Sequence, residues 1–207
     1  MITSFTLDRK AAASADGPVY VSESGAYIGT LTQVSVADTP SGATYIDIAF
    51  KTDDGRVCFP RMFVTKKDGS KAFSHAIFQA LLAVLSIETA PVVPSKVYRR
   101  DGTSFEGHRI LSVEAKHVGL LLQKELRTFV DKDGVEKDTY QMNIVTPFDA
   151  VSRRTAREIL TGADEAKLLD AKLKGLKDRD SRKHTEQVPQ PPAGHPAVAA
   201  IDDDMPF

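Results

Sequence analysis

Apolar side chains alternate with other residues from Gly25 to Lys66, and this period of two constrains the fold more than any other feature of the sequence. Successive side chains of a strand point to opposite faces of a sheet, so the alternation predicts strands. Turn-forming residues at 38–42 and 53–55 divide the stretch, because Asp-Gly readily adopts the positive φ values of tight hairpins. We therefore expect three strands joined by short turns.

The alternation divides each of the first two expected strands into two faces. In the first strand, the even-numbered residues 26–36 are expected on one face and the odd-numbered residues on the other. In the second strand, Ile46, Ile48 and Phe50 share a face, and Tyr45 lies opposite.

The third strand is expected over 56–66 and contains Pro60. Proline cannot donate a hydrogen bond to a neighbouring strand, so an edge, a bulge or a sharp bend is expected at this position. The alternation places Phe59, Arg61 and Phe63 on the same face.

An arginine between two phenylalanines suits a surface that stacks nucleic-acid bases. The rings of Phe59 and Phe63 offer π-faces, and Arg61 offers a cation to a phosphate. The opposite orientation, in which both phenylalanines belong to the core and Cys58 and Met62 face outward, fits the same alternation. Both orientations remain open on the sequence.

The hydrophobic period changes after residue 70. From Lys71 to Ser86 apolar residues recur every three or four positions, which predicts a helix with Ser70 as its N-cap. The expected apolar stripe consists of Phe73, Ile77, Ala80, Leu81, Val84 and Leu85. Alternation returns at 118–130 and 137–146, and the turn residues 131–134 separate two further strands.

The stretch between the helix and these strands is expected to be mostly loop. Pro91 and Pro94 bracket a loop, Tyr98–Gly102 is a basic and aromatic turn, and 109–115 is compatible with a short strand.

Three strands, a helix and two further strands therefore follow one another. This is the order of the OB-fold, a five-stranded barrel. We expect a mainly β protein with α elements, in which a five-stranded OB-fold barrel occupies 24–150, with a helix between strands three and four. A loosely ordered N-terminal arm at 1–23 is expected before it.

Two helices are expected in a C-terminal extension at 151–180. Ser152 can cap the first helix, and Gly162 can end it. The second helix, roughly 164–177, carries a leucine stripe that is expected to pack on the barrel, although it could instead form a dimer contact. Beyond the helices, the proline-rich residues 181–201 predict a flexible linker.

The six residues Asp202–Phe207 are typical of a peptide that another protein binds. Three adjacent aspartates repel one another and keep the segment solvated. Pro206 restricts the residue before it to extended conformations, so Phe207 presents its ring and its carboxylate on a stiff end. An apolar pocket rimmed by basic side chains could bind this tip.

The tip resembles the acidic C-terminal tip of the bacterial and phage single-stranded DNA-binding proteins. The residues that carry the resemblance are Asp202, Asp203, Asp204, Met205, Pro206 and Phe207. The resemblance covers these six residues directly. It implies an OB-fold that binds single-stranded DNA, and a tip that recruits replication, recombination and repair proteins. The two helices after the barrel depart from the family's simplest pattern.

The charge balance restricts how nucleic acid could be bound. The chain has 207 residues and a formal net charge of −1. From Ser181 onward two basic residues stand against four acidic ones, which leaves 25 basic and 24 acidic residues before that point. A nucleic-acid surface must therefore be a local patch.

Other classes of function find little support in the sequence. Cys58 is the only cysteine, so neither an intrachain disulfide nor a cysteine-based zinc site is expected. There is no glycine-rich phosphate loop and no recognisable set of catalytic residues, so we expect no enzymatic activity, no cofactor and no metal. The N-terminus lacks an apolar signal core, and no apolar run is long enough to cross a bilayer, so a cytoplasmic protein without a membrane partner is expected.

The leading hypothesis is a sequence-nonspecific single-stranded DNA-binding protein that serves replication, recombination or repair. The residues expected to stack on bases or contact phosphates are Tyr45, Lys51, Arg56, Phe59, Arg61, Phe63, Lys66, Lys67, Arg99, Arg100, Arg127 and Tyr140. Two alternatives remain: an adaptor whose barrel binds protein while its tip mimics the host tail, or a recombination mediator that anneals strands. A homo-oligomer, if one forms, is expected to be a dimer.

Overall fold

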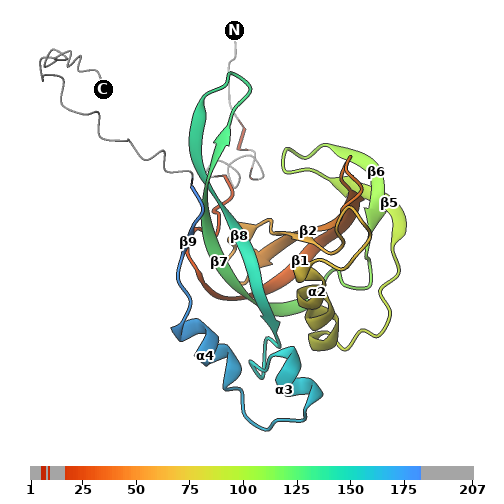
Figure 1. The fold of residues 1–207 in the computed structure, drawn as a ribbon, viewed down its shortest axis with the longest axis vertical. Helices are drawn as coiled ribbons and strands as arrows, with labels where there is room; N and C mark the ends of the chain where they lie inside the picture. Colours follow the sequence, from red (N-terminus) through yellow and green to blue (C-terminus); the bar gives the residue numbers. More distant parts are fainter. Residues whose placement is uncertain (1–5, 8, 10–16, 183–207) are drawn as a thin grey trace, which may run out of the picture.

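The computed structural model describes residues 6–7, 9 and 17–182, which form a mainly β structure with a few short helices (Figure 1). The strands are β1 (Gly25–Asp38), β2 (Thr44–Thr52), β3 (Val57–Cys58), β4 (Arg61–Phe63), β5 (Val93–Tyr98), β6 (Ser104–Arg109), β7 (His117–Val130), β8 (Glu136–Phe148) and β9 (Arg179–Asp180). The helices are α2 (Phe73–Val84), α3 (Ala156–Leu160) and α4 (Leu168–Lys174). Most of the expected arm and of the linker, and the whole tip 202–207, lie outside the described residues.

β1 is the central strand of an open, mainly antiparallel sheet. One edge of β1 pairs with β2, which in turn pairs with β3 and β4. The other edge pairs with β7 through residues 25–30 and with β6 through Ser35 and Val36. β7 pairs with β8, and β6 pairs with β5. The expected succession of strands and helix is therefore present as β1, β2, β3–β4, α2, β7 and β8.

The expected closed barrel is not formed. Closing the order β4-β2-β1-β7-β8 would require a ladder between β4 and β8, and the described parts of these strands form none. α2 contacts both β8 and β4 instead, and Figure 1 shows the helix beside the end of β8. The helix thus covers the core at the place where strand pairing is missing.

A β-bulge at Thr32 divides β1 into two halves with opposite faces. Leu31 and Gln33 pair with consecutive residues of β2, so Thr32 is the extra residue. Leu31 and Val34 are consequently both fully buried in the main core. Because a one-residue shift exchanges the two faces of a strand, the expected assignment of all even-numbered residues 26–36 to one face is wrong.

A second, smaller core lies between the sheet and the α4 region. It consists of Leu121, Phe148 and Leu169, with Ala26, Ile28, Val145 and Leu176 packed against them. Leu169 of α4 is fully buried there, so the expected packing of the leucine stripe on the sheet is confirmed for this residue. The α4 helix itself is shorter than the sequence predicts.

Pro60 interrupts the expected third strand, which becomes the two short strands β3 and β4. Its carbonyl oxygen accepts a hydrogen bond of 3.0 Å from the backbone N of Ile48. Cys58 and Met62 are 3% and 2% exposed, whereas Phe63 is 44% exposed. The orientation with the phenylalanines outward is therefore present, and the alternative with Cys58 and Met62 outward is excluded. Burial also raises the pKa of the Cys58 thiol to about 12.

Residues 19–21, at the end of the segment expected to be a loose arm, lie along β3. The backbone N of Val21 donates to the carbonyl of Val57 at 3.0 Å, and the backbone N of Val57 donates to the carbonyl of Val19 at 2.8 Å. Val21 is 1% exposed and belongs to the main core. These residues are therefore part of the folded body.

α2 begins at Phe73, two residues later than expected. Ser70 is not its N-cap, because the Ser70 hydroxyl donates to the carboxylate of Asp68 at 2.6 Å. The buried residues of α2 are Phe78, Leu81, Leu82 and Val84. The expected stripe is wrong at Phe73, which is 87% exposed.

One carboxylate holds α3 and α4 together. Thr155, not Ser152, caps α3 and forms a capping box with Glu158. Glu158 Oε2 accepts hydrogen bonds from the backbone N and the hydroxyl of Thr155, and Oε1 accepts from the backbone N–H groups of residues 167 and 168 at the start of α4. Burial would raise the pKa of Glu158, but these hydrogen bonds lower it to about 2.

β9 is a short strand that the sequence did not predict, and it pairs parallel to β7 at Glu125 and Leu126. Glu125 is 4% exposed and accepts hydrogen bonds from Ser181, Asn143 and Arg127. Burial would raise the pKa of Glu125, but these hydrogen bonds outweigh it and lower the pKa to about 2. The segment just before the expected linker is thereby attached to β7.

Among the helices of the described residues, none combines the length and the apolar character needed to cross a bilayer.

Candidate functional site

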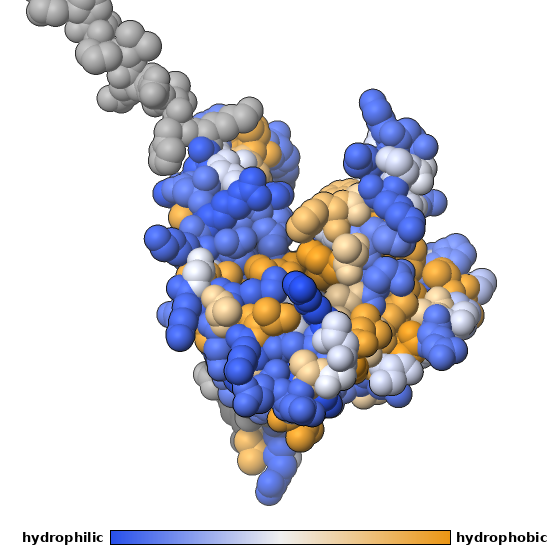
Figure 2. All heavy atoms as spheres, turned by 60° about the horizontal axis from the view of Figure 1, so that its bottom comes forward, coloured by the Kyte–Doolittle hydropathy of each residue, from blue (hydrophilic) through white to orange (hydrophobic). Residues whose placement is uncertain are grey.

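A groove of about 1170 Å³ separates the outer face of β1, β2 and β4 from the β5–β6 hairpin. We call this hairpin, residues 93–109, the arm; it is distinct from the N-terminal arm expected at 1–23. Figure 2 shows the molecule hollowed between two hydrophilic lobes, with hydrophobic residues toward the bottom of the hollow. Gln141 and Met142 of β8 contribute to the lining from the side opposite the arm.

β1 changes its partner at the bulge, and this change positions the arm. Residues before the bulge pair with β7, and residues after it pair with β6. The side chain of Gln33 also holds β5: its Nε2 donates to the carbonyl of Tyr98 at 3.1 Å, and its Oε1 accepts from the backbone N of Tyr98 at 2.9 Å. Both strands of the arm are therefore bonded to β1.

A mostly buried ion pair supports the base of the arm. Arg109, the last residue of β6, pairs with Glu114, and the two side chains are 16% and 10% exposed. Glu114 Oε1 also accepts a hydrogen bond of 2.9 Å from the backbone N of Val34, where β1 passes from one partner strand to the next. Arg109 Nη1 donates to the carbonyl of Lys96 on β5 at 3.0 Å. The hydrogen bond with Glu114 raises the pKa of Arg109.

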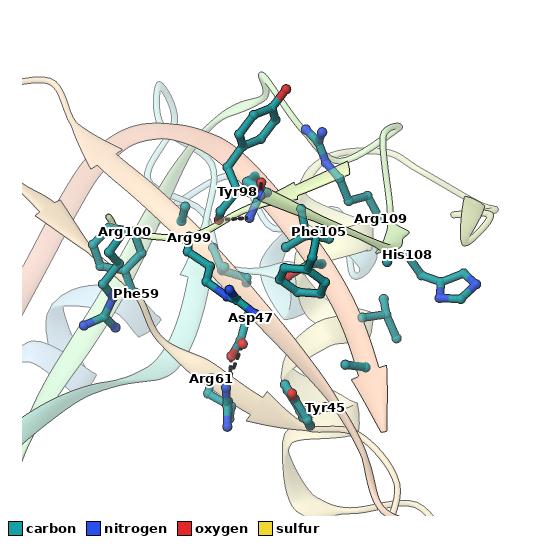
Figure 3. Close-up of a pocket in the computed structure, with 18 of the residues that line it drawn as sticks. Tyr45, Asp47, Phe59, Arg61, Tyr98, Arg99, Arg100, Phe105, His108 and Arg109 are labelled. Atoms are coloured by element: carbon teal, nitrogen blue, oxygen red, sulfur yellow. Dashed lines mark hydrogen bonds and ion pairs between the residues drawn. The ribbon is translucent and has the colours of Figure 1, made fainter. Parts of the chain in front are cut away.

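Three arginine side chains lie over aromatic rings in the groove (Figure 3). The distances from the guanidinium carbon to the ring centroid are 4.0 Å for Arg61 and Tyr45, 4.8 Å for Arg99 and Phe105, and 4.3 Å for Arg100 and Phe59. The contact between Arg100 and Phe59 joins the turn of the arm to the β3–β4 connection across the groove.

The three arginines differ in how their charge is compensated. Arg61 donates two hydrogen bonds to the carboxylate of Asp47, at 2.6 and 2.8 Å. Arg99 and Arg100 form no ion pair with any described residue and rest on their rings. The available positive charge of the groove is therefore concentrated in the turn of the arm.

The structure brings together five of the twelve residues predicted to bind DNA. Those that line the groove are Tyr45, Phe59, Arg61, Arg99 and Arg100. Phe63 lies next to them on the same outer face, with its ring centroid 5.9 Å from that of Tyr45. Local alternation and the basic turn at 98–102 were thus sufficient to find this group.

The other six predicted residues lie outside the groove lining. They are Lys51, Arg56, Lys66, Lys67, Arg127 and Tyr140. Arg56 is bonded to Asp54 in the β2–β3 turn, and Arg127 to the buried Glu125. Lys124 lies over the ring of Tyr140 at 5.2 Å, on the β7–β8 hairpin.

The sequence reasoning found Arg99 and Arg100 but missed the hairpin that carries them and the other groove residues. These include Tyr98, Phe105, His108 and Arg109, together with Gln33 opposite them on β1. The expected short strand at 109–115 is wrong, since 111–115 form a turn. An available signal was the Asp-Gly pair at 101–102, which is flanked by two stretches that form the hairpin.

No family model matches the chain, and no curated protein is similar enough to count as a relative. Within the described part of the chain, no three His, Cys, Asp or Glu side chains lie close enough together to hold a metal ion.

Proposed function

We propose that the chain binds single-stranded nucleic acid, in the first place single-stranded DNA, in the groove beneath the arm and without sequence preference. The observation that carries this proposal is the row of three arginine–aromatic pairs along one open groove. Aromatic rings stack on any base, and guanidinium groups contact any phosphate, so such a surface discriminates little between sequences.

The chemistry of the groove favours a single strand over a duplex. A duplex keeps the faces of its bases stacked within the helix, where Tyr45, Phe59 and Phe105 could not reach them. An unpaired base can lie on a ring that an arginine now covers, and the displaced guanidinium then lies beside the adjacent phosphate. Arg99 and Arg100, which form no ion pair with a described residue, supply the positive charge that this exchange requires.

The OB-fold assignment belongs to the same proposal. The order of β1, β2, β3–β4, α2, β7 and β8 supports it, and the open edge between β4 and β8 makes this an opened variant of that barrel. The arm, which follows α2, is an addition to the five-stranded pattern. In this proposal the segment 202–207 recruits replication, recombination or repair proteins, as its resemblance implies.

The test is a salt titration of binding to labelled single-stranded and duplex DNA, with the full chain and two double variants. Arg99→Gln with Arg100→Gln removes the free charge of the arm. Lys172→Gln with Lys174→Gln removes the same charge from the exposed surface of α4, outside the groove. Circular dichroism checks that each variant folds.

We expect binding to single-stranded DNA that weakens as salt rises, with at least tenfold lower affinity for duplex. The arm variant should lose about tenfold or more in affinity for the single strand, because two phosphate contacts are removed. The α4 variant should stay within about twofold of the unchanged chain. No binding at low salt, or equal affinity for duplex, would overturn the proposal. Tip-dependent capture of replication enzymes without any DNA binding would instead select the adaptor function.

A further inference from the structure

Asp47 lines the groove, and both of its carboxylate oxygens accept hydrogen bonds from Arg61, a residue predicted to bind phosphate. Asp47 of β2 and Arg61 of β4 are directly opposite each other in the ladder. Arg61 Nε donates to Oδ1 at 2.6 Å, and Nη2 donates to Oδ2 at 2.8 Å. A phosphate would use the same two donors, because carboxylates and phosphates both bind a guanidinium through two oxygens.

The pairing of Asp47 with Arg61 also affects whether the ring of Tyr45 is covered. Arg61 lies 4.0 Å from the centroid of Tyr45, so the arginine that Asp47 holds is also the one that covers this ring. Tyr45 in turn lies next to Phe63, directly opposite in the same ladder. At the other rings no described carboxylate forms an ion pair with the arginine, although the charge of Arg99 acts on Asp101 in the same turn.

We propose that Asp47 is an internal competitor of nucleic-acid phosphates, which holds Arg61 over Tyr45 and thereby limits the affinity of the groove. This inference rests on the proposed function and names the residue that sets its strength. A nucleic-acid strand first contacts Arg99 and Arg100 of the arm. The end of the groove at Tyr45 adds to the affinity only where a phosphate displaces the Asp47 carboxylate from Arg61. Asp47 also repels phosphates directly, so both effects act in the same direction.

Both side chains are partly exposed, at 39% for Asp47 and 49% for Arg61, so a phosphate from solution can reach the pair. An exposed ion pair contributes little to folding stability, because water and salt screen it. Removing the carboxylate should therefore leave the fold intact while freeing Arg61 for DNA.

The experiment is a double-mutant cycle on the full chain, using an oligothymidylate of about 16 nucleotides as the probe. The variants are Asp47→Asn, Arg61→Gln and the two combined. The control is Asp170→Asn on α4, which removes the same charge from another exposed Asp–Arg pair, with Arg153, outside the groove. Thermal unfolding is followed for each, and Asp47→Ala replaces Asp47→Asn if the asparagine still holds Arg61.

We expect Asp47→Asn to raise the affinity about three- to tenfold at low salt, and to steepen the salt dependence by roughly 0.7 in the log–log slope, as one more phosphate is contacted. Arg61→Gln alone should lower the affinity, and in the Arg61→Gln background the gain from Asp47→Asn should shrink to the part that comes from relief of direct repulsion. Asp170→Asn should leave affinity unchanged.

Three results would overturn the inference while leaving the proposed function in place. These are an unchanged or lower affinity of Asp47→Asn, an equal gain for Asp170→Asn, or a gain from Asp47→Asn that is just as large in the Arg61→Gln background. Absence of DNA binding by the unchanged chain would refute the proposed function itself, and the two failures are therefore distinguishable.

Discussion

The side-chain amide of Gln33 forms two hydrogen bonds with the backbone of Tyr98, a residue 65 positions away in the chain. Gln33 is the residue after the β1 bulge, and Tyr98 is the last residue of β5 before the turn that carries Arg99 and Arg100. The bulge therefore orients the side chain of Gln33 toward the arm. Its hydrogen bonds to Tyr98 position the turn that carries Arg99 and Arg100 beside the groove.

Replacing Gln33 by alanine should weaken DNA binding without unfolding the protein. The two hydrogen bonds are exposed, so their loss is expected to cost about 1 kcal/mol or less of folding free energy. The arm turn should lose its fixed position, and affinity for a single strand should fall about three- to tenfold. Hydrogen exchange at the amide of Tyr98 should accelerate. Gln79→Ala, on an exposed position of α2, serves as the control and should change neither quantity.

Replacing Phe59 and Phe63 together by alanine should weaken single-strand binding by about tenfold or more, since base stacking contributes about 1–3 kcal/mol per base. Phe63 is 44% exposed and Phe59 is half-buried beside Arg100, so the main core keeps its packing. Fluorescence anisotropy with an oligothymidylate measures the loss. Phe73→Ala, at a residue 87% exposed on α2, controls for the removal of an exposed ring. Unfolding of the double variant would show that the rings support the core.

Stability should fall in acid partly through Glu125. The pKa of this carboxyl is about 2 in the folded protein, against an ordinary value of 4.5. A depressed pKa means that its contribution is complete above pH 4.5 and is lost as the pH falls toward 2. The shift corresponds to roughly 3 kcal/mol. Urea unfolding of the unchanged chain and of Glu125→Gln should therefore differ most near pH 6 and converge near pH 2.

The control for this measurement is Glu165→Gln, which alters an exposed carboxylate on the loop before α4. It should change the unfolding free energy little at any pH. If Glu125→Gln is as stable as the unchanged chain near pH 6, the hydrogen bonds around Glu125 do not stabilise the attachment of β9.

Truncation after Ala200 should separate DNA binding from partner recruitment. The removed segment contains Asp202–Phe207, whose negative charge would compete weakly with DNA for a cationic groove. We expect single-strand affinity to be unchanged or raised by less than about threefold, while capture of replication and repair enzymes is lost. Replacing Phe207 alone by alanine keeps the aspartates and should also abolish capture. A large loss of DNA affinity on truncation would contradict this division of labour.

Much of the strand order follows from local sequence. Alternation and the Asp-Gly turns predicted β1, β2, β7 and β8, because the period of two and the positive φ of glycine are properties of a few neighbouring residues. The same alternation grouped Phe59, Arg61 and Phe63 on one face, but it could not say which face was buried. Burial depends on what packs against a strand, and α2 and β8 supply that only in the folded chain.

The arm was missed because its strands are short and contain Pro94 and Gly107, which weaken a strand signal. Pro94 is tolerated because β5 lies at an edge of the sheet. Gly107 is required because a Cβ there would lie 2.9 Å from the side chain of Val97 on the paired strand.

Local sequence patterns predict a mainly β chain in which three strands, a helix and two strands follow in order, and they place Tyr45, Arg61 and Phe63 on the strands that become β2 and β4. The open sheet, the bulge at Thr32 and the pairing of Asp47 with Arg61 arise only in the folded chain. Those outcomes depend on contacts between residues far apart in the chain, whose geometry no local period specifies.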